Sequence, residues 1–265
     1  MTPTSQVFAA DGFSPPGPGD FELPPIFGDN ADLFTKPQFL LVIAAVLVFG
    51  FFFVTSRRTA MVPSKGQYAG EQAYGFVRNS IARDVIGSHD FLAFVPWLVA
   101  TFFFVLVNNL FGVVPFIQFP SFSRASFAYG LAALVWLLYN GIGVYKHGFF
   151  GYIKHTTVPA GISGPILLLI IPLEFASNIL VRPATLALRL FANMFAGHLL
   201  LILFTLGGEY LLIEAGGALY KPVGVIAFIL AIAISFLEIL VQFLQAYVFT
   251  LLTAIYISGA LAEEH

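Results

Sequence analysis

Near the end of the sequence, one apolar run from Pro222 to Ser258 contains a single charged residue, Glu238. A helix of about 37 residues, rising about 1.5 Å per residue, is about 55 Å long, whereas the hydrocarbon core of a bilayer is about 30 Å thick. Because backbone groups in lipid must be satisfied within the segment itself, such a run forms a helix. We therefore expect a membrane helix that tilts steeply or extends beyond the hydrocarbon.

The composition supports the same conclusion for the whole chain. Of its 265 residues, 58% are hydrophobic and 10% are charged, whereas a soluble domain is about 25% charged. The apolar runs do not alternate with polar residues at every second position, as the strands of a membrane barrel would. We predict an all-α integral membrane protein. The lack of cysteine excludes disulfides and thiolate metal sites, and no basic tract indicates nucleic-acid binding.

The hydropathy pattern predicts about five membrane-embedded helices and one surface helix. The stretch 163–206 contains Pro172 and Pro183, so it forms either one kinked helix or two shorter ones. Residues 65–88 are too polar to span, but their apolar residues recur at helical spacing, which indicates a surface helix or a polar loop docked on other helices. Connections are expected at 118–125, after Lys146 and at 207–221. The expected spans are 38–56, 91–117, 126–146, 163–206 and 222–258.

The distribution of basic residues predicts the orientation. Lysine and arginine prefer the cytoplasmic side of a membrane, and the segments 57–83 and 146–154 hold seven of them, against three in the opposite segments. This predicts an acidic tail rich in Pro and Gly outside, over residues 1–37, and a short tail inside, over residues 259–265. We expect no cleaved signal peptide, because no basic segment with an apolar core and cleavage site precedes the first span.

A positive charge lies deep within the stretch before the last helix. Arg189 at bilayer depth costs about 2.5–3.5 kcal/mol on insertion scales, so its default interpretation is functional. At about 100° per residue, Arg189, Asn193 and Gly197 share one helical face, and neighbouring alanines would let a second helix approach closely. The alternative is an ion pair with Glu174 or Glu238 that only holds helices together.

A second group of polar residues includes two that can titrate. Glu238, Gln242 and Gln245 share one stripe of the last helix, whereas His198 points away from the face of the arginine. Histidine titrates near neutral pH, so His198 and Glu238 on two helices would form a proton relay, with amide side chains holding water. Asn109, near the far end of the second span, would line an aqueous opening. Hydrogen bonds that only join helices are the alternative for each of these groups.

Two motifs resemble the signature of subunit a of F-type ATP synthases. They are Leu186–His198, which reads LALRLFANMFAGH, and Leu244–Tyr256, which reads LQAYVFTLLTAIY. Both occur in the expected order, in a chain of matching length and span number, and the hydropathy layout extends the resemblance over roughly residues 35–258. The resemblance implies a few upright helices and a long, strongly tilted hairpin of the last two helices, curved round a ring of c subunits.

The resemblance also implies a function. The chain would be a stator subunit, not an enzyme by itself, that provides two offset proton half-channels beside the rotating c-ring and so couples proton flow to ATP synthesis. Arg189 resembles the family's essential arginine, Asn193 and Gln245 its polar neighbours, and His198 and Glu238 the titratable pair of the outer half-channel. The residues expected along the proton path are Asn109, Glu174, Arg189, Asn193, His198, Glu238, Gln242 and Gln245.

The implied partners are the c-ring, the b-type peripheral stalk subunits and the rest of the ATP synthase, together with the lipid bilayer and protons. The implied location is a bacterial plasma membrane, with the N-terminus outside and the C-terminus in the cytoplasm. No cofactor, metal or nucleic acid is implied. The chain lacks a phosphate-binding loop, so ATP chemistry would occur in other subunits.

Two positions depart from the family pattern. Gly112 stands where many members have an acid, three residues after the asparagine that Asn109 resembles. Glu174 resembles the glutamate of the inner half-channel, but its spacing to Arg189 is one residue longer than in the pattern.

Other classes of membrane protein remain as alternatives. A proton-coupled secondary transporter for an anionic substrate would use Arg189 and Glu238, but such folds usually contain an internal repeat, and we find none. A haem-binding redox subunit needs axial ligands on its spans, and only His198 is clearly intramembrane. A sodium-driven version of the same machine stays open, because ion choice depends largely on ring residues of other chains.

Overall fold

The fold is described from a computed structural model of the chain, which covers residues 15–17, 19, 35–57, 62–88, 90–114, 116–158, 166–215 and 220–262. Within these residues, five helices are long and apolar enough to cross a membrane. This confirms the predicted all-α membrane fold. The five are α1 (Lys36–Ser56), α4 (Phe91–Leu110), α5 (Ala125–His147), the continuous helix Leu167–Ile213 and α9 (Tyr220–Leu261).

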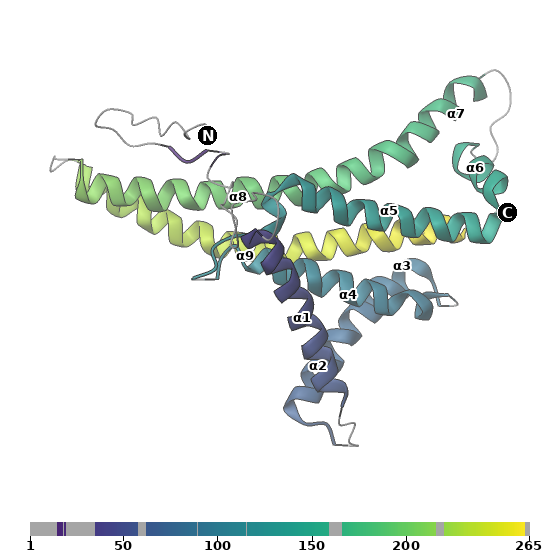
Figure 1. The fold of residues 1–265 in the computed structure, drawn as a ribbon, viewed down its shortest axis with the longest axis horizontal. Helices are drawn as coiled ribbons and strands as arrows, with labels where there is room; N and C mark the ends of the chain where they lie inside the picture. The colour runs from purple at the N-terminus through teal and green to yellow at the C-terminus, as the bar shows by residue number, and fades with distance from the viewer. Residues whose placement is uncertain are drawn as a thin grey trace.

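The helix Leu167–Ile213 and α9 form a long hairpin (Figure 1). The first of these helices consists of α7 (Leu167–Ala176), a π-helical turn η4 (Ser177–Val181) and α8 (Arg182–Ile213). Of the two arrangements expected for this stretch, the chain therefore adopts the single long helix. Pro183 is the second residue after the π-helical turn, at a point where the helical hydrogen-bond ladder is already altered, so its missing N–H does not end the helix.

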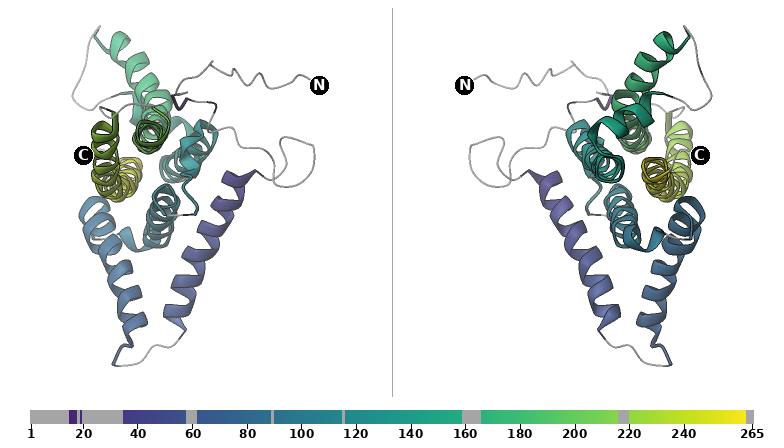
Figure 2. Two further views of the ribbon diagram at one scale, coloured as in Figure 1. Left: turned by 90° about the vertical axis from the view of Figure 1, so that its left-hand side faces the viewer. Right: turned by 90° about the vertical axis from the view of Figure 1, so that its right-hand side faces the viewer.

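The hairpin crosses the first helix at a large angle. In Figure 1, α8 and α9 run across the view and α1 runs down it, and in Figure 2 the hairpin is seen nearly end-on while α1 is seen along its length. Helix α9 has 42 residues, which at about 1.5 Å per residue is about 63 Å, roughly twice the thickness of the hydrocarbon core. A membrane crossed upright by α1 therefore holds the hairpin at a steep tilt.

The core lies where α4, α5, α8 and α9 pack together. Helix α5 turns small residues toward this core, including Ala128, Ala132 and Gly143, which are buried. A second, smaller cluster joins Leu40 and Ala44 of α1 to Phe111 and Phe119. The membrane domain is therefore one packed body in which the hairpin contacts α3, α4, α5 and α6.

The polar segment expected at the surface is helical and docked. It comprises α2 (Lys65–Val77), the π-helical turn η2 (Arg78–Arg83) and α3 (Asp84–Ile86). The Ser64 hydroxyl accepts a hydrogen bond of 3.3 Å from the Gln67 N–H and so caps the start of α2. Val77 and Ile81 are fully buried in the core. The segment is therefore helical, as the first expectation has it, and it packs on other helices instead of lying free on the membrane surface.

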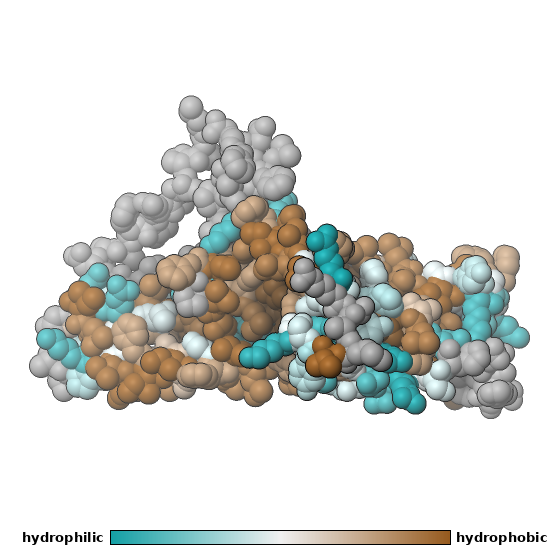
Figure 3. Space-filling model, turned by 90° about the horizontal axis from the view of Figure 1, so that it is seen from below, coloured by the Kyte–Doolittle hydropathy of each residue, from teal (hydrophilic) through white to brown (hydrophobic). Residues whose placement is uncertain are grey.

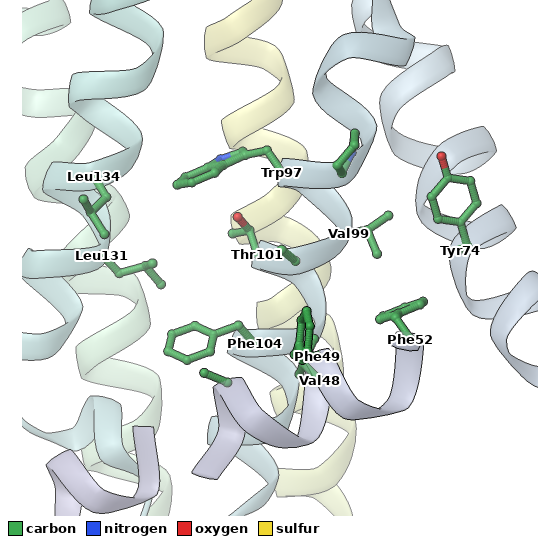
Figure 4. A pocket seen from close by; sticks show the side chains of 13 residues that line it. Val48, Phe49, Phe52, Tyr74, Trp97, Val99, Thr101, Phe104, Leu131 and Leu134 are labelled. Carbon is green, nitrogen blue, oxygen red and sulfur yellow. The ribbon is translucent and has the colours of Figure 1, made fainter. Parts of the chain in front are cut away.

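An apolar cavity of about 540 Å³ lies between α1, α2, α4 and α5 (Figure 4). Phe49 and Phe52 of α1 face Trp97 and Phe104 of α4 across it, with Leu131 of α5 at one side. Hydrophobic residues also cover much of the face seen in Figure 3, and hydrophilic residues gather toward the right-hand half of that face. These surfaces suit contact with lipid or with apolar partner helices.

Three boundaries differ from the sequence expectation. Helix α4 ends at Leu110 rather than at 117, because Gly112 and Pro115 in the following apolar run disfavour a helix. The region after Lys146, expected as a loop, contains α6 (Phe149–Thr157), which starts after Gly148 at a φ of 71°. The expected connector 207–221 is mostly helical, since α8 continues to Ile213 and α9 begins at Tyr220.

The tails fall mostly outside the described residues. Of the expected N-terminal tail, 1–37, the structure describes only residues 15–17, 19 and the start of α1 from Thr35. Of the expected C-terminal tail, 259–265, it describes residues up to 262, and α9 continues to Leu261. The predicted orientation of the two ends stays a prediction.

Candidate functional site

Small residues allow the two arms of the hairpin to approach closely. A Cβ atom added to Gly197 of α8 would lie 3.0 Å from Oε1 of Glu238 on α9. Further along, a Cβ atom on Gly208 would lie 3.1 Å from the Phe228 ring, and one on Gly224 would lie 2.7 Å from Cγ of Leu212. A larger residue at these positions would require the facing side chain to move or the helices to separate, so the glycines permit the close approach.

The polar stripe expected on the last helix is the buried face of α9. Glu238 is 5% exposed, Gln242 0% and Gln245 3%. Thr250 and Thr253, which continue the stripe, are also buried and donate to the carbonyl groups of Ala246 and Phe249, four residues earlier. The side chains that sequence reasoning selected on α9 therefore point into the protein.

Two side-chain hydrogen bonds tie neighbouring helices to this stripe. Nδ2 of Asn193 on α8 donates to Oε1 of Gln245 over 2.7 Å. Nδ2 of Asn109 on α4, which is fully buried, donates to the main-chain carbonyl of Gln242 over 3.3 Å. Asn109, Asn193, Gln242 and Gln245 are thus brought together at one level of the bundle.

Many polar atoms at this level make no well-formed hydrogen bond to the described residues, although Glu238 and Gln242 lie close enough to interact with each other. These atoms are Oδ1 of Asn109, both oxygens of Glu238, both side-chain polar atoms of Gln242 and Nε2 of Gln245. More than about 90% of buried polar groups in proteins are hydrogen-bonded, and an unsatisfied one costs about 1–3 kcal/mol. Buried water usually supplies the missing bonds. The row extends over Glu238 to Gln245, about 10 Å of helix.

His198 belongs to the buried face of α8, one turn after Met194. It is 4% exposed, and its ring centre lies 6.5 Å from that of Phe119. Lys36, at the start of α1, is close enough to act electrostatically on it and donates to the Ile117 carbonyl over 3.0 Å. The oxygens of Glu238 make no hydrogen bond to His198, so the two residues are not joined directly, although Gly197 next to His198 contacts Glu238.

Arg189 is exposed, on a face of α8 that no other part of the described chain covers. The exposed positions Thr185, Leu188, Ala192 and Ala196 lie on the same face. No ion pair joins Arg189 to another described residue: Glu174 accepts from Asn178 over 3.4 Å, and the neighbour of Glu238 is the uncharged Gln242. The alternative of an internal ion pair that only holds helices together therefore has no support here.

Glu174 belongs to a different region, closer to the start of the helix Leu167–Ile213. It lines a polar cavity of about 230 Å³ together with Asn178 and Arg182 of the same helix. Arg189 lies between this cavity and the row of unpartnered polar atoms, seven residues after Arg182 and four before Asn193. The site residues thus form two polar regions with an exposed arginine between them.

Several polar residues of the cavity were not selected from the sequence. Tyr152 and Thr156 belong to α6, which was expected as a loop, so no helical pattern pointed to them. Tyr256 and Asn178 lie within apolar stretches and carry no charge, and the sequence offers no signal that distinguishes them from residues that only join helices. No cluster of three or more His, Asp or Glu side chains suited to a metal ion occurs among the described residues.

The family model and the relatives that match this chain all describe the same kind of protein. Residues 38–258 match the family model described as ATP synthase A chain. The chain is 62% identical over 265 residues to ATP synthase subunit a of a Nocardioides species, an alignment that covers 96% of this chain and 95% of the relative. It is 50% identical to ATP synthase subunit a of an Arthrobacter species, with coverage of 96% and 95%. It is 41% identical to that of Streptomyces lividans, with coverage of 98% and 92%.

Proposed function

Because the chain belongs to the ATP synthase A chain family, we propose that it forms the stationary wall of two proton half-channels beside a rotating ring of c subunits. The chain is a proton-translocating component of the synthase and not its catalytic part. The ring carboxylates carry protons between the half-channels, and the rotation drives ATP synthesis in other subunits.

The row of buried, unpartnered polar atoms is the observation that carries this proposal. Asn109, Glu238, Gln242 and Gln245 offer donors and acceptors that buried water would satisfy. In the outer half-channel, a proton passes His198 and reaches Glu238, and ordered water then carries it along the amides to a ring carboxylate. The neutral carboxylate enters lipid at low cost because it has lost its charge.

Arg189 separates the two paths. Its exposed position on α8 suits contact with a carboxylate of a partner helix, and the small residues beside it leave room for that helix. A guanidinium is permanently charged, so it attracts an ionised ring carboxylate but cannot pass on a proton. Its charge also repels a proton that would move directly between the half-channels. Each proton that crosses 100 mV instead supplies about 2.3 kcal/mol to rotation.

The polar cavity of about 230 Å³ around Glu174, here called the inner polar cavity, suits the second half-channel. Glu174 and Asn178 line it, seven or more residues before Arg189 on the same continuous helix. By the distribution of basic residues, this end faces the cytoplasm and the start of α1 faces outside. The stalk subunits would contact apolar surfaces such as the cavity between α1, α2, α4 and α5.

Proton pumping by the assembled complex with Arg189→Ala tests this proposal. ATP is added to inside-out membrane vesicles, acidification is followed, and passive proton leak through the membrane sector is measured separately. We expect acidification to be lost with assembly intact, and the leak to rise. Thr185→Ala is the matched control, because Thr185 is exposed one turn earlier on the same face and is uncharged. Normal pumping by the Arg189→Ala complex would contradict the proposal and favour a transporter.

A further inference from the structure

The inner polar cavity is built by four separate parts of the chain. Tyr139 comes from α5, Tyr152 and Thr156 from α6, Glu174, Asn178 and Arg182 from the long helix, and Tyr256 from α9. The guanidinium of Arg182 lies 5.5 Å from the centre of the Tyr256 ring. A cavity with this many polar groups therefore depends on the rotational position of the long helix about its axis.

The sequence spacing alone would not place these side chains on one face. Eight residues separate Glu174 from Arg182, and at about 100° per residue an unbroken α-helix would turn them about 80° apart. Seven residues separate Arg182 from Arg189, which leaves those two only about 20° apart. In an unbroken α-helix, Phe175 rather than Glu174 would share the face of Arg182.

The π-helical turn η4, Ser177–Val181, lies between Glu174 and Arg182. A π-helical turn contains about one residue more than an α-helical turn, and such turns are frequent at functional sites. One residue is therefore absorbed, and the effective spacing of Glu174 and Arg182 becomes seven. In agreement, Glu174 and Arg182 line the same cavity, whereas Phe175 is 44% exposed.

Neighbouring helices hold the turn in this form. The Tyr139 hydroxyl donates to the main-chain carbonyl of Asn178 over 3.0 Å, and Nδ2 of Asn178 donates to the carbonyl of Thr156 over 2.7 Å. The ring of Tyr152 packs against Gly143, where a Cβ atom would collide with it, and its hydroxyl donates to Asn140 over 2.9 Å. Both α5 and α6 therefore fix the segment around Asn178.

We propose that η4 is a register device: it absorbs one residue, so that Glu174 and Arg182 share the face of Arg189 and form the cavity into which ring carboxylates release their protons. The extra residue between Glu174 and Arg189 then leaves the inner half-channel in place. This inference rests on the proposed function, because it assigns the cavity to proton release.

Cysteine labelling tests the register in the assembled complex, and the sequence has no other cysteine to interfere. Glu174→Cys and Phe175→Cys are made singly and exposed, from the cytoplasmic side of the vesicles, to a charged thiol reagent that does not cross membranes. We expect position 174 to react at least tenfold faster than position 175. Gly259→Cys is the positive control, since Gly259 lines the cavity and has open space for a side chain. Equal rates, or faster reaction at 175, would overturn the register.

Two matched deletions test the consequence for function. Leu180 in η4 and Leu188 in α8 are both exposed leucines, at 64% and 47%. Deleting Leu180 should convert the π-helical turn into an α-helical one and keep ATP-driven pumping within about twofold. Deleting Leu188 should rotate the cavity residues by about 100° relative to Arg189 and reduce pumping at least tenfold. Equal pumping by the two variants, whether normal or lost, would overturn the inference.

The two proposals fail in different ways. Normal pumping by the Arg189→Ala complex removes the proposed function, whatever the deletions do. Lost pumping in that complex, together with labelling at position 175 or equal effects of the deletions, leaves the proposed function standing and removes only the register device. If a deletion prevents assembly, the labelling rates at positions 174 and 175 decide the question, because neither requires a change in chain length.

Discussion

The close contact between Gly197 and Glu238 predicts how proton pumping depends on the size of the side chain at position 197. A Cβ atom on Gly197 would lie 3.0 Å from Oε1 of Glu238, which is 0.4 Å closer than ordinary contact at 3.4 Å. In Gly197→Ala, the flexible carboxylate can move by this amount. Gly197→Val adds two further methyl groups, and overpacking of this kind costs about 1–3 kcal/mol. If this cost displaces the proton-accepting carboxylate, pumping falls about 5- to 150-fold.

ATP-driven acidification of vesicles measures this loss, with the amount of assembled complex determined in the same preparation. Gly50→Val in α1 is the matched control, because no atom lies within 4 Å of a Cβ added at Gly50. We expect the control to pump normally, Gly197→Ala to lose little and Gly197→Val to lose most activity. Pumping by the Gly197→Val complex at the level of the control would refute the reasoning that Glu238 must keep its place beside α8.

Two further predictions concern single hydrogen bonds. Asn193→Ala and Gln245→Ala remove one shared hydrogen bond of 2.7 Å. Made singly and together, they should show a coupling energy of about 0.5–1.5 kcal/mol in thermal denaturation of the purified complex. Additive effects of the two substitutions would contradict the presence of that bond. Burial raises the pKa of the Tyr152 hydroxyl above its usual 10.0, so its contribution to stability is present below pH 10 and is lost as the pH rises through the folded pKa. Tyr152→Phe should therefore lower the melting temperature at neutral pH, because the hydrogen bond to Asn140 is lost. It should also reduce the further decrease of the melting temperature between about pH 9 and about pH 11. A melting temperature that falls with pH as steeply as in the unsubstituted protein would contradict this prediction.

Span number and the general fold could be predicted because they depend on apolar length alone. A segment of 20 or more apolar residues has few other structures open to it in lipid. The ends of helices could not be predicted equally well. The run after Leu110 is as apolar as a span, yet α4 ends there, and α6 forms where charges and glycine suggested a loop. In α6 the contacts of Tyr152 with Gly143 and Asn140 stabilise the helix. Such tertiary contacts cannot be predicted from the local sequence pattern.

The stripe on α9 could be predicted because helical periodicity holds over an unbroken α-helix. Glu238, Gln242 and Gln245 are buried together, as their spacing indicates. The same arithmetic fails across η4, where one turn takes an additional residue. The spacing from Glu174 to Arg189 is one residue longer than in the family pattern, and the proposed role of η4 accounts for this residue by a change of helix type. The cavity around Asn178 depends on that change and on α6, so the sequence alone could not assemble it.

Close packing around Gly112, in the loop after α4, also limits which side chain this position can hold. A Cβ atom on Gly112 would lie 3.2 Å from the Asn109 carbonyl and 3.2 Å from Cβ of Pro120, so an acidic side chain would require the loop after α4 to shift. The charge nearest this loop is instead Lys36, which donates to the Ile117 carbonyl. In the proposed path, a proton from outside therefore meets the imidazole of His198 before any carboxylate of the described chain. Glu238 then remains the acid of the outer half-channel, which is why its space beside Gly197 matters more here than it would in a chain with a second acid at the mouth.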